Sequence, residues 1–136
     1  MDFLKKHCTD VGLLWLRVLA GCGMAYHGYG KIFEGRLGQF TEGVAAMGFP
    51  IPEVFAWAAA LSEFAGGICL ALGLFTRLSA LMILATMSVA AFVAHADDPF
   101  QKKELALAYW GVSGALVFLN GGKLSLDYLI QKNKSN

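Results

Sequence analysis

One carboxylate of the chain, that of Glu63, lies in an apolar segment where a charge is energetically costly. Glu63 lies near the middle of an apolar segment at about 54–75, which is about 22 residues long. A helix of this length can cross the hydrocarbon core of a bilayer, and a carboxylate there costs several kcal/mol unless it is paired, protonated or hydrated. Small residues surround Glu63 at helical spacing, so another helix can approach it closely. We expect Arg17, which also interrupts an apolar segment, to be its direct or water-bridged partner.

Six polar side chains fall inside or beside the apolar segments and could form a polar column that opens at the outer surface. These candidates for ligand binding or proton transfer are Arg17, His27, Lys31, Glu63, His95 and Glu104. Intramembrane charges often mark such sites, but an Arg17–Glu63 pair that only fixes helix packing is the alternative. The His and Glu spacing matches no recognised metal signature, so no metal site is predicted. No residue is identified as catalytic.

The composition indicates that membrane helices position these side chains. Of the 136 residues, 57% are hydrophobic and 15% are charged, and the mean hydropathy is +0.55. Four apolar blocks predict an all-α, integral membrane four-helix bundle in a single domain over residues 1–136, with helices at about 10–33, 54–75, 77–95 and 103–119. The expected surroundings are a lipid bilayer. The net charge of +1 indicates no nucleic-acid partner.

The connecting segments carry their own helix signals. A short interfacial helix between the first two long helices is indicated by apolar residues at helical spacing, namely Leu37, Phe40, Val44 and Met47. Pro52 suits the first turn of the next helix. Thr76 is expected to cap the third helix, and Ser125 to cap a final short helix at about 126–132.

Basic residues predict the orientation of the bundle. Four crossings place both termini on one side, which carries six basic residues: Lys5, Lys6, Arg77, Lys123, Lys132 and Lys134. The other side carries four: Lys31, Arg36, Lys102 and Lys103. The excess of positive charge on cytoplasmic loops then predicts that both termini are cytoplasmic.

Several short motifs recur in an order that resembles a known family. The first half of the chain carries Arg17, His27-Gly28-Tyr29-Gly30-Lys31 and Gly48-Phe49-Pro50-Ile51-Pro52. The second half carries Glu63-Phe64-Ala65-Gly66-Gly67, Leu72-Gly73-Leu74-Phe75-Thr76-Arg77, His95, Glu104-Leu105-Ala106-Leu107 and the end from Gly121 to Asp127. Over about residues 11–128 the chain resembles the DoxX-like family of small four-helix bacterial membrane proteins.

The resemblance implies a multi-pass protein of the bacterial inner (cytoplasmic) membrane. The family includes the membrane subunit of a thiosulfate:quinone oxidoreductase and members linked to thiol and oxidative-stress defence. The resemblance therefore implies, at most, a membrane subunit of a quinone-linked oxidoreductase. The chain has no haem, flavin or iron–sulfur motif, so no covalently bound cofactor is expected, and a quinone is the candidate ligand.

Three functional hypotheses follow. The first is a redox-associated membrane component that interacts with a quinone and works with a soluble partner, with Arg17, His27, Lys31 and Glu63 shaping the pocket. The second is a small transporter or permeability factor that uses the same polar column. The third is a membrane scaffold with no catalysis of its own. A homo-oligomer is compatible with each of them.

Overall fold

The computed structural model describes the backbone of residues 2–135 and the side chains of residues 7–135, and this part of the chain contains helices and no strands. In order, the elements are α1 (Asp2–Phe33), α2 (Leu37–Ala46), α3 (Pro52–Leu72), α4 (Thr76–Val89), the π-helical segment η1 (Ala90–Ala94), α5 (Phe100–Leu119) and α6 (Leu126–Lys134). The predicted all-α fold, with a short helix between the first two long helices, is confirmed.

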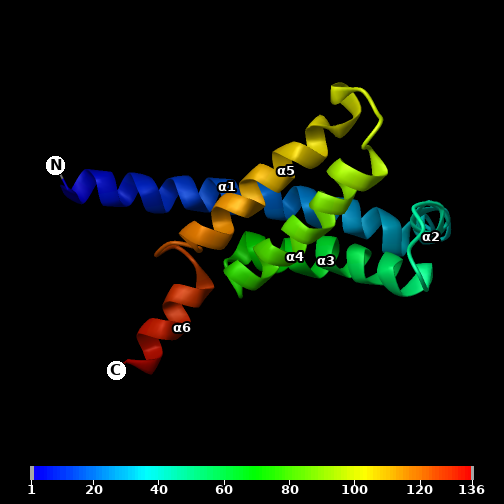
Figure 1. The fold of residues 1–136 in the computed structure, drawn as a ribbon. Helices are drawn as coiled ribbons and strands as arrows, with labels where there is room; N and C mark the ends of the chain where they lie inside the picture. Colours follow the sequence, from blue (N-terminus) through cyan, green and yellow to red (C-terminus); the bar gives the residue numbers. More distant parts are fainter. Residues whose placement is uncertain (1, 136) are drawn as a thin grey trace.

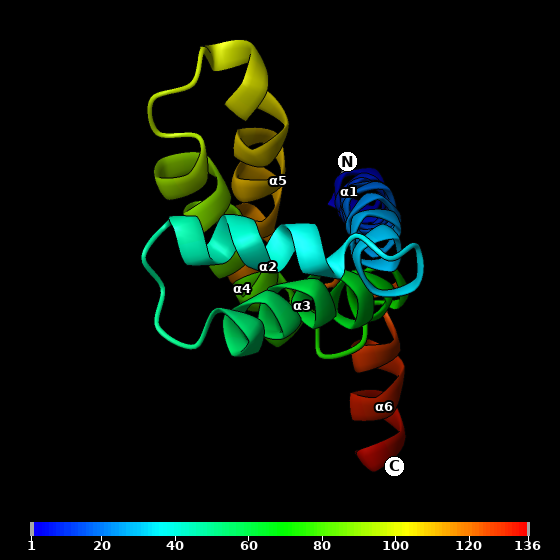
Figure 2. The ribbon, with the colours of Figure 1, turned by 90° about the vertical axis from the view of Figure 1, so that its right-hand side faces the viewer.

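The long helices form two pairs that meet at one end and separate at the other (Figure 1). α1 packs antiparallel along α3, and α4 packs along α5. At the closed end, the α3–α4 turn meets the segment between α5 and α6, and both termini lie on this side. At the open end, η1 and the start of α5 stand away from α1 and α3, while α2 lies across the ends of the helices (Figures 1 and 2).

Glycines let α1 and α3 pack with their backbones in contact. A Cβ atom added to Gly67 would lie 2.5 Å from the backbone nitrogen of Ala25, and one added to Gly21 would lie 2.5 Å from that of Ala71. Gly28 faces the backbone of Phe64 in the same way. Small residues at a helix crossing are typical of membrane proteins, where close packing drives association.

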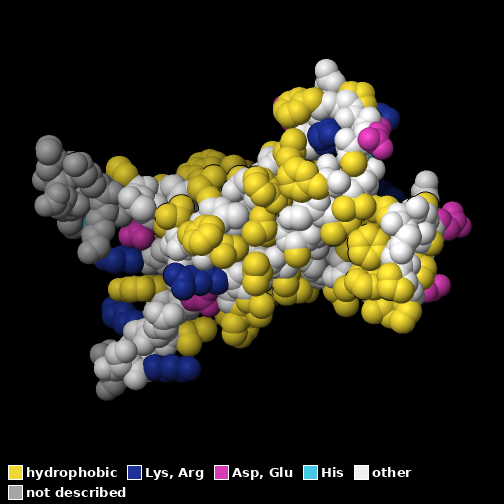
Figure 3. Space-filling view, in the orientation of Figure 1, with side chains coloured by type: hydrophobic (Ala, Val, Ile, Leu, Met, Phe, Trp, Pro, Cys, Tyr) yellow, Lys and Arg dark blue, Asp and Glu magenta, His cyan; other side chains and the backbone are white. Residues whose placement is uncertain are grey.

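Within the described residues, three helices are long and apolar enough to cross a membrane. They are His7–Phe33, Pro52–Leu72 and Thr76–Ala94, the last of which combines α4 and η1. α5 contains 20 residues, but charged residues at its start, Lys102, Lys103 and Glu104, shorten its apolar part. Large hydrophobic side chains such as Trp15, Leu19 and Phe118 are exposed on the outside of the bundle, and Figure 3 shows this apolar surface. Such a surface suits contact with lipid.

The boundaries of the helices differ from the predicted ones for local reasons. α3 ends at Leu72 rather than Phe75 because Gly73 has φ +71°, a left-handed conformation that glycine adopts at helix ends. α5 begins at Phe100, directly after Pro99, rather than at Lys103. Pro52 and Glu53 lie in the first turn of α3, as expected from the helix dipole and the missing proline N–H.

Candidate functional site

A cavity of about 620 Å³ lies at the open end, between the two helix pairs. All the long helices contribute to its walls, and α2 adds Phe40 and Val44 across the end, followed by Met47 directly after the helix. Most of the lining is apolar. The polar side chains of the lining are His27, Lys31, Ser62, Glu63, Thr86, His95, Lys102 and Tyr109. An apolar cavity with a few polar groups is the usual form of a small-molecule site.

The ion pair between Lys31 and Glu63 is the most buried charged feature of this cavity. The Lys31 Nζ atom donates a hydrogen bond to Glu63 Oε2, and the two side chains are 21% and 3% exposed, respectively. Nζ also lies 4.3 Å from the centre of the Phe40 ring, where the ring face attracts a cation. The pair therefore presents one cation and one carboxylate to a molecule in an otherwise apolar space.

The crossing of α1 and α3 explains why these two residues meet. Gly28 packs against Phe64, and Lys31 lies three residues further along the same face of α1. In the antiparallel pair, the Lys31 backbone lies slightly beyond the level of Glu63, and its long side chain leans back toward the α1 N-terminus and reaches the carboxylate. In the sequence, the spacing from Gly28 to Lys31 places both residues on one face of α1. Pairing Lys31 with Glu63 also requires the position of α1 along α3, which depends on how the two helices pack.

Arg17 has other partners, so the predicted direct Arg17–Glu63 pair is wrong. Its Nε atom donates to Gly121 O at 3.1 Å and its Nη1 atom to Ala71 O at 2.9 Å, while Nη2 donates to Leu124 O. Ala71 is eight residues from Glu63, or about 12 Å along α3, which is more than a single water can bridge. Arg17 is buried at the closed end. Its guanidinium group has five N–H donors, so it can bind several carbonyl oxygens at once.

Asp127 joins α6 to the start of α4 at the same closed end. Its carboxylate accepts hydrogen bonds from the backbone nitrogens of Phe75 and Thr76, both at 2.8 Å, and its own N–H donates to Gly73 O at 2.9 Å. The predicted cap by Thr76 is wrong, because Thr76 is the first residue of α4 and Asp127 supplies the acceptor. The Thr76 hydroxyl is buried without a hydrogen-bond partner in the described part of the protein.

The predicted cap of the final helix is confirmed. The Ser125 hydroxyl accepts a hydrogen bond from the backbone nitrogen of Tyr128 at 3.2 Å. A serine at this position satisfies one of the free N–H groups of the first turn. The Ser125 cap stabilises the first turn of α6, and Asp127 joins this turn to the start of α4.

Two further polar pairs line the cavity, and of their four residues only His27 was among the sequence candidates. Thr86 Oγ1 on α4 lies 3.2 Å from Ser62 Oγ on α3, and Ser62 directly precedes Glu63. The rings of His27 and Tyr109 meet edge to face, with 6.1 Å between their centres, and so connect α1 to α5. Hydroxyl residues in apolar helices carry no strong sequence signal, because they commonly bond to the preceding turn of their own helix.

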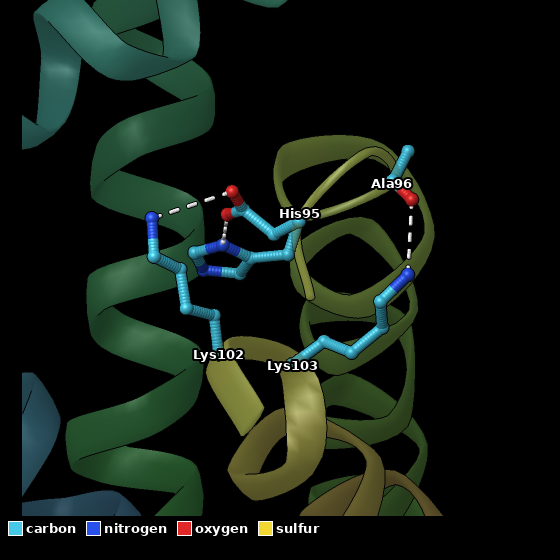
Figure 4. Close-up of polar contacts among 5 residues, drawn as sticks. His95, Ala96, Lys102 and Lys103 are labelled. Atoms are coloured by element: carbon cyan, nitrogen blue, oxygen red, sulfur yellow. Dashed lines mark hydrogen bonds and ion pairs between the residues drawn. The ribbon is translucent and has the colours of Figure 1, made fainter. Parts of the chain in front are cut away.

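The mouth of the cavity carries a small charged network around His95 (Figure 4). His95 Nδ1 lies 2.7 Å from Asp98 Oδ2, and Lys102 Nζ lies 3.5 Å from Asp98 Oδ1. The hydrogen bond with His95, supported by the charge of Lys102, holds the pKa of the Asp98 carboxyl below its ordinary value. His95 follows the π-helical η1, and π-helical turns occur often at functional sites.

The structure therefore divides the six candidate residues. His27, Lys31, Glu63 and His95 line one cavity. Arg17 lies at the closed end, and Glu104 is exposed on α5 outside the cavity lining. No three His, Cys, Asp or Glu side chains within the described residues cluster as metal ligands would.

Comparisons with known proteins show which proteins the chain is similar to. Residues 12–96 match the DoxX protein family. The chain is also similar to inner membrane protein YqjF of Escherichia coli strain K12, with 31% identity over 135 residues, which cover 93% of this chain and 98% of the relative. No solved protein structure matches the chain.

Proposed function

The chain belongs to the DoxX family. We propose that it is a bacterial inner-membrane protein whose cavity binds a quinone. In this proposal the protein is the membrane component of a redox process and works with a soluble partner. The inner-membrane location follows the similar protein of Escherichia coli, which is named an inner membrane protein, and three helices suited to a bilayer support it.

The observation that carries the proposal is a largely apolar cavity of about 620 Å³ with a buried ion pair in its wall. A quinone has a flat ring, an apolar tail and two carbonyl oxygens. Apolar side chains such as Met24, Phe55 and Met87 would bury the ring and tail. Lys31 would donate a hydrogen bond to a carbonyl oxygen, and a charged donor makes this bond stronger than a neutral one would.

The residues around the cavity have distinct roles in this proposal. A bound quinone supplies a two-electron, two-proton redox couple. Glu63 holds the Lys31 ammonium in place and offers a carboxylate that can carry a proton beside the bound ring. His95, at the mouth, is half-buried and lines the same cavity, so it can exchange protons between water and the cavity. A soluble partner would exchange the electrons, since the sequence has no haem, flavin or iron–sulfur motif.

Binding of decylubiquinone to the purified protein tests the proposal directly. The quinone quenches tryptophan fluorescence, and its affinity can be compared between the original protein and variants. Lys31→Gln and Glu63→Gln each remove one charge of the cavity, and we expect them to weaken binding at least tenfold, or by about 1.4 kcal/mol. Glu104→Gln is the matched control, because it makes the same change at an exposed carboxylate outside the lining.

Two outcomes would contradict the proposal and identify the alternatives. If no variant changes quenching, or if Glu104→Gln weakens it as much as Glu63→Gln, the cavity is not the quinone site. Flux of a solute through proteoliposomes that depends on Glu63 would instead indicate a transporter. Loss of thermal stability alone, with neither binding nor flux, would indicate a scaffold.

A further inference from the structure

The short α6 presents an apolar face that the rest of the described chain does not cover. Leu126, Leu129 and Ile130 follow each other at intervals of three and one along the helix, which places them on one face. All three are exposed, and α6 has no buried residue. Lys132 and Lys134 flank this face, as basic residues do on helices that lie in a membrane interface.

The attachment of α6 fixes its direction. Asp127 binds the backbone of the α3–α4 turn, and Arg17 binds the carbonyl of Leu124 just before the helix. Figure 2 looks nearly along α1 and shows α6 extending to one side of the bundle, and Figure 1 shows that α6 also slants toward the side on which the N-terminus lies. When the bundle spans the membrane, such a helix lies beside the closed end, near the membrane surface, rather than within the bundle.

Positive charge surrounds α6 at the closed end. Arg77, Lys123, Lys132 and Lys134 are exposed there and form no ion pair with another described residue. The acidic side chains described at this end are already engaged, because Asp10 accepts from the Lys123 N–H and Asp127 from the α3–α4 turn. Dark-blue Lys and Arg side chains accordingly gather around α6 in Figure 3.

We propose that α6 lies in the headgroup layer and that its apolar face and adjacent cations bind anionic phospholipid. The leucine and isoleucine side chains enter the boundary with the acyl chains. The four cations lie among the headgroups, where each Lys or Arg adds to the attraction to anionic lipid. This inference is independent of the quinone proposal, since it uses the opposite end of the bundle.

Spin labels on two faces of α6 test the proposal. In a variant without its native cysteines, Leu129→Cys places a nitroxide on the apolar face, and Gln131→Cys places one on the nearly opposite face. The protein is reconstituted into phosphatidylcholine vesicles with and without phosphatidylglycerol. Collisions with oxygen report exposure to lipid, and collisions with a water-soluble nickel complex report exposure to water.

We expect the label at position 129 to lie in lipid and the label at position 131 in water when phosphatidylglycerol is present. Phosphatidylcholine alone should reduce the depth at 129. Lys132→Gln with Lys134→Gln should give the same reduction and lower the preference for phosphatidylglycerol about fivefold or more. Arg36→Gln with Lys103→Gln removes as much charge at the open end and should leave the depth at 129 unchanged.

Three results would overturn the proposal. Water at both positions in both lipids would place α6 in the aqueous phase. Equal depth at 129 with and without phosphatidylglycerol would exclude recognition of anionic headgroups. Protection of both labels from oxygen and nickel alike would show that protein, rather than lipid, covers the helix.

Discussion

At the scale of single residues, the chemistry depends on which acceptor each buried cation meets. Lys31 meets the carboxylate of Glu63, whereas Arg17 meets three backbone carbonyls. The carbonyls leave Arg17 fully charged and fix it in place. The Lys31–Glu63 pair, in contrast, joins a donor and a titratable acceptor, so it can change its hydrogen bonds when a ligand enters.

Glu63→Gln should harm function more than stability. The amide keeps the shape and can still accept a hydrogen bond from Lys31, but it loses the charge and the titratable proton. Breaking a fully buried pair costs about 3–5 kcal/mol. We expect about 1–3 kcal/mol here, because Lys31 is 21% exposed and keeps its contact with Phe40.

Thermal unfolding in detergent and oxidant resistance of cells, measured in parallel, check this expectation. A loss of stability of no more than about 1–3 kcal/mol, with lost resistance per folded molecule, would support a ligand-binding role for Glu63. The opposite result, lost stability with normal resistance per folded molecule, would make the carboxylate a packing residue only.

The contact between His95 and Asp98 should persist into acid. Because the hydrogen bond lowers the pKa of Asp98 in the folded protein, the contact contributes stability above the ordinary Asp pKa of about 4. That contribution is lost as the pH falls through the lower folded value. A carbon NMR titration of the Asp98 carboxyl measures this, and His95→Gln should move its midpoint up toward the ordinary value. An unchanged midpoint in that variant would refute the assignment.

At the scale of helices, the glycine contact between α1 and α3 sets the height at which Lys31 meets Glu63. The spacing of Arg17, Gly21, Gly28 and Lys31 in the sequence places them on one face of α1, and these residues are buried or half-buried in the structure. It does not give the position of α1 along the axis of α3. That position depends on which glycine meets which backbone segment, and Arg17 was therefore assigned to the wrong partner.

Gly67→Ala should destabilise the bundle by about 1–3 kcal/mol, as overpacking does. The added Cβ would lie 2.5 Å from the Ala25 nitrogen and 2.7 Å from the Gly21 oxygen, and neither backbone atom can move alone. Gly111→Ala is the control, because a Cβ there meets nothing within 4 Å. A lower midpoint of thermal unfolding for the first variant only is expected; equal midpoints would mean that the helices are not in close contact.

At the scale of the whole molecule, the hydrophobic pattern predicted the number and order of the long helices, because runs of apolar residues report burial in lipid directly. The cavity was not predictable from the same pattern. Its space lies between the two helix pairs, where α4 and α5 diverge from α1 and α3 at the open end. His27, Lys31, Glu63 and His95 share the cavity, whereas Glu104 on the exposed face of α5 does not.

Both termini are expected to be cytoplasmic, from the six-to-four distribution of basic residues. They lie on the same side of the bundle in Figure 1, so one experiment addresses both. Single cysteines at position 2 or 135 of a variant without native cysteines should resist an impermeant thiol reagent in intact cells and react after lysis. Reaction in intact cells would reverse the orientation.

Arg17 and Asp127 hold the closed end together, so the α4–α5 pair can rotate about that end. α4 and η1 together span 19 residues, or about 28 Å, so a rotation of about 5° at the α3–α4 turn would move the far end by about 2.5 Å. Such a displacement widens the cavity at its mouth and hardly at its base. If the cavity binds a quinone as proposed, this motion would let it take ligands of different width without breaking a contact of Arg17 or Asp127. Amide hydrogen exchange should then become steadily faster from the closed end toward η1.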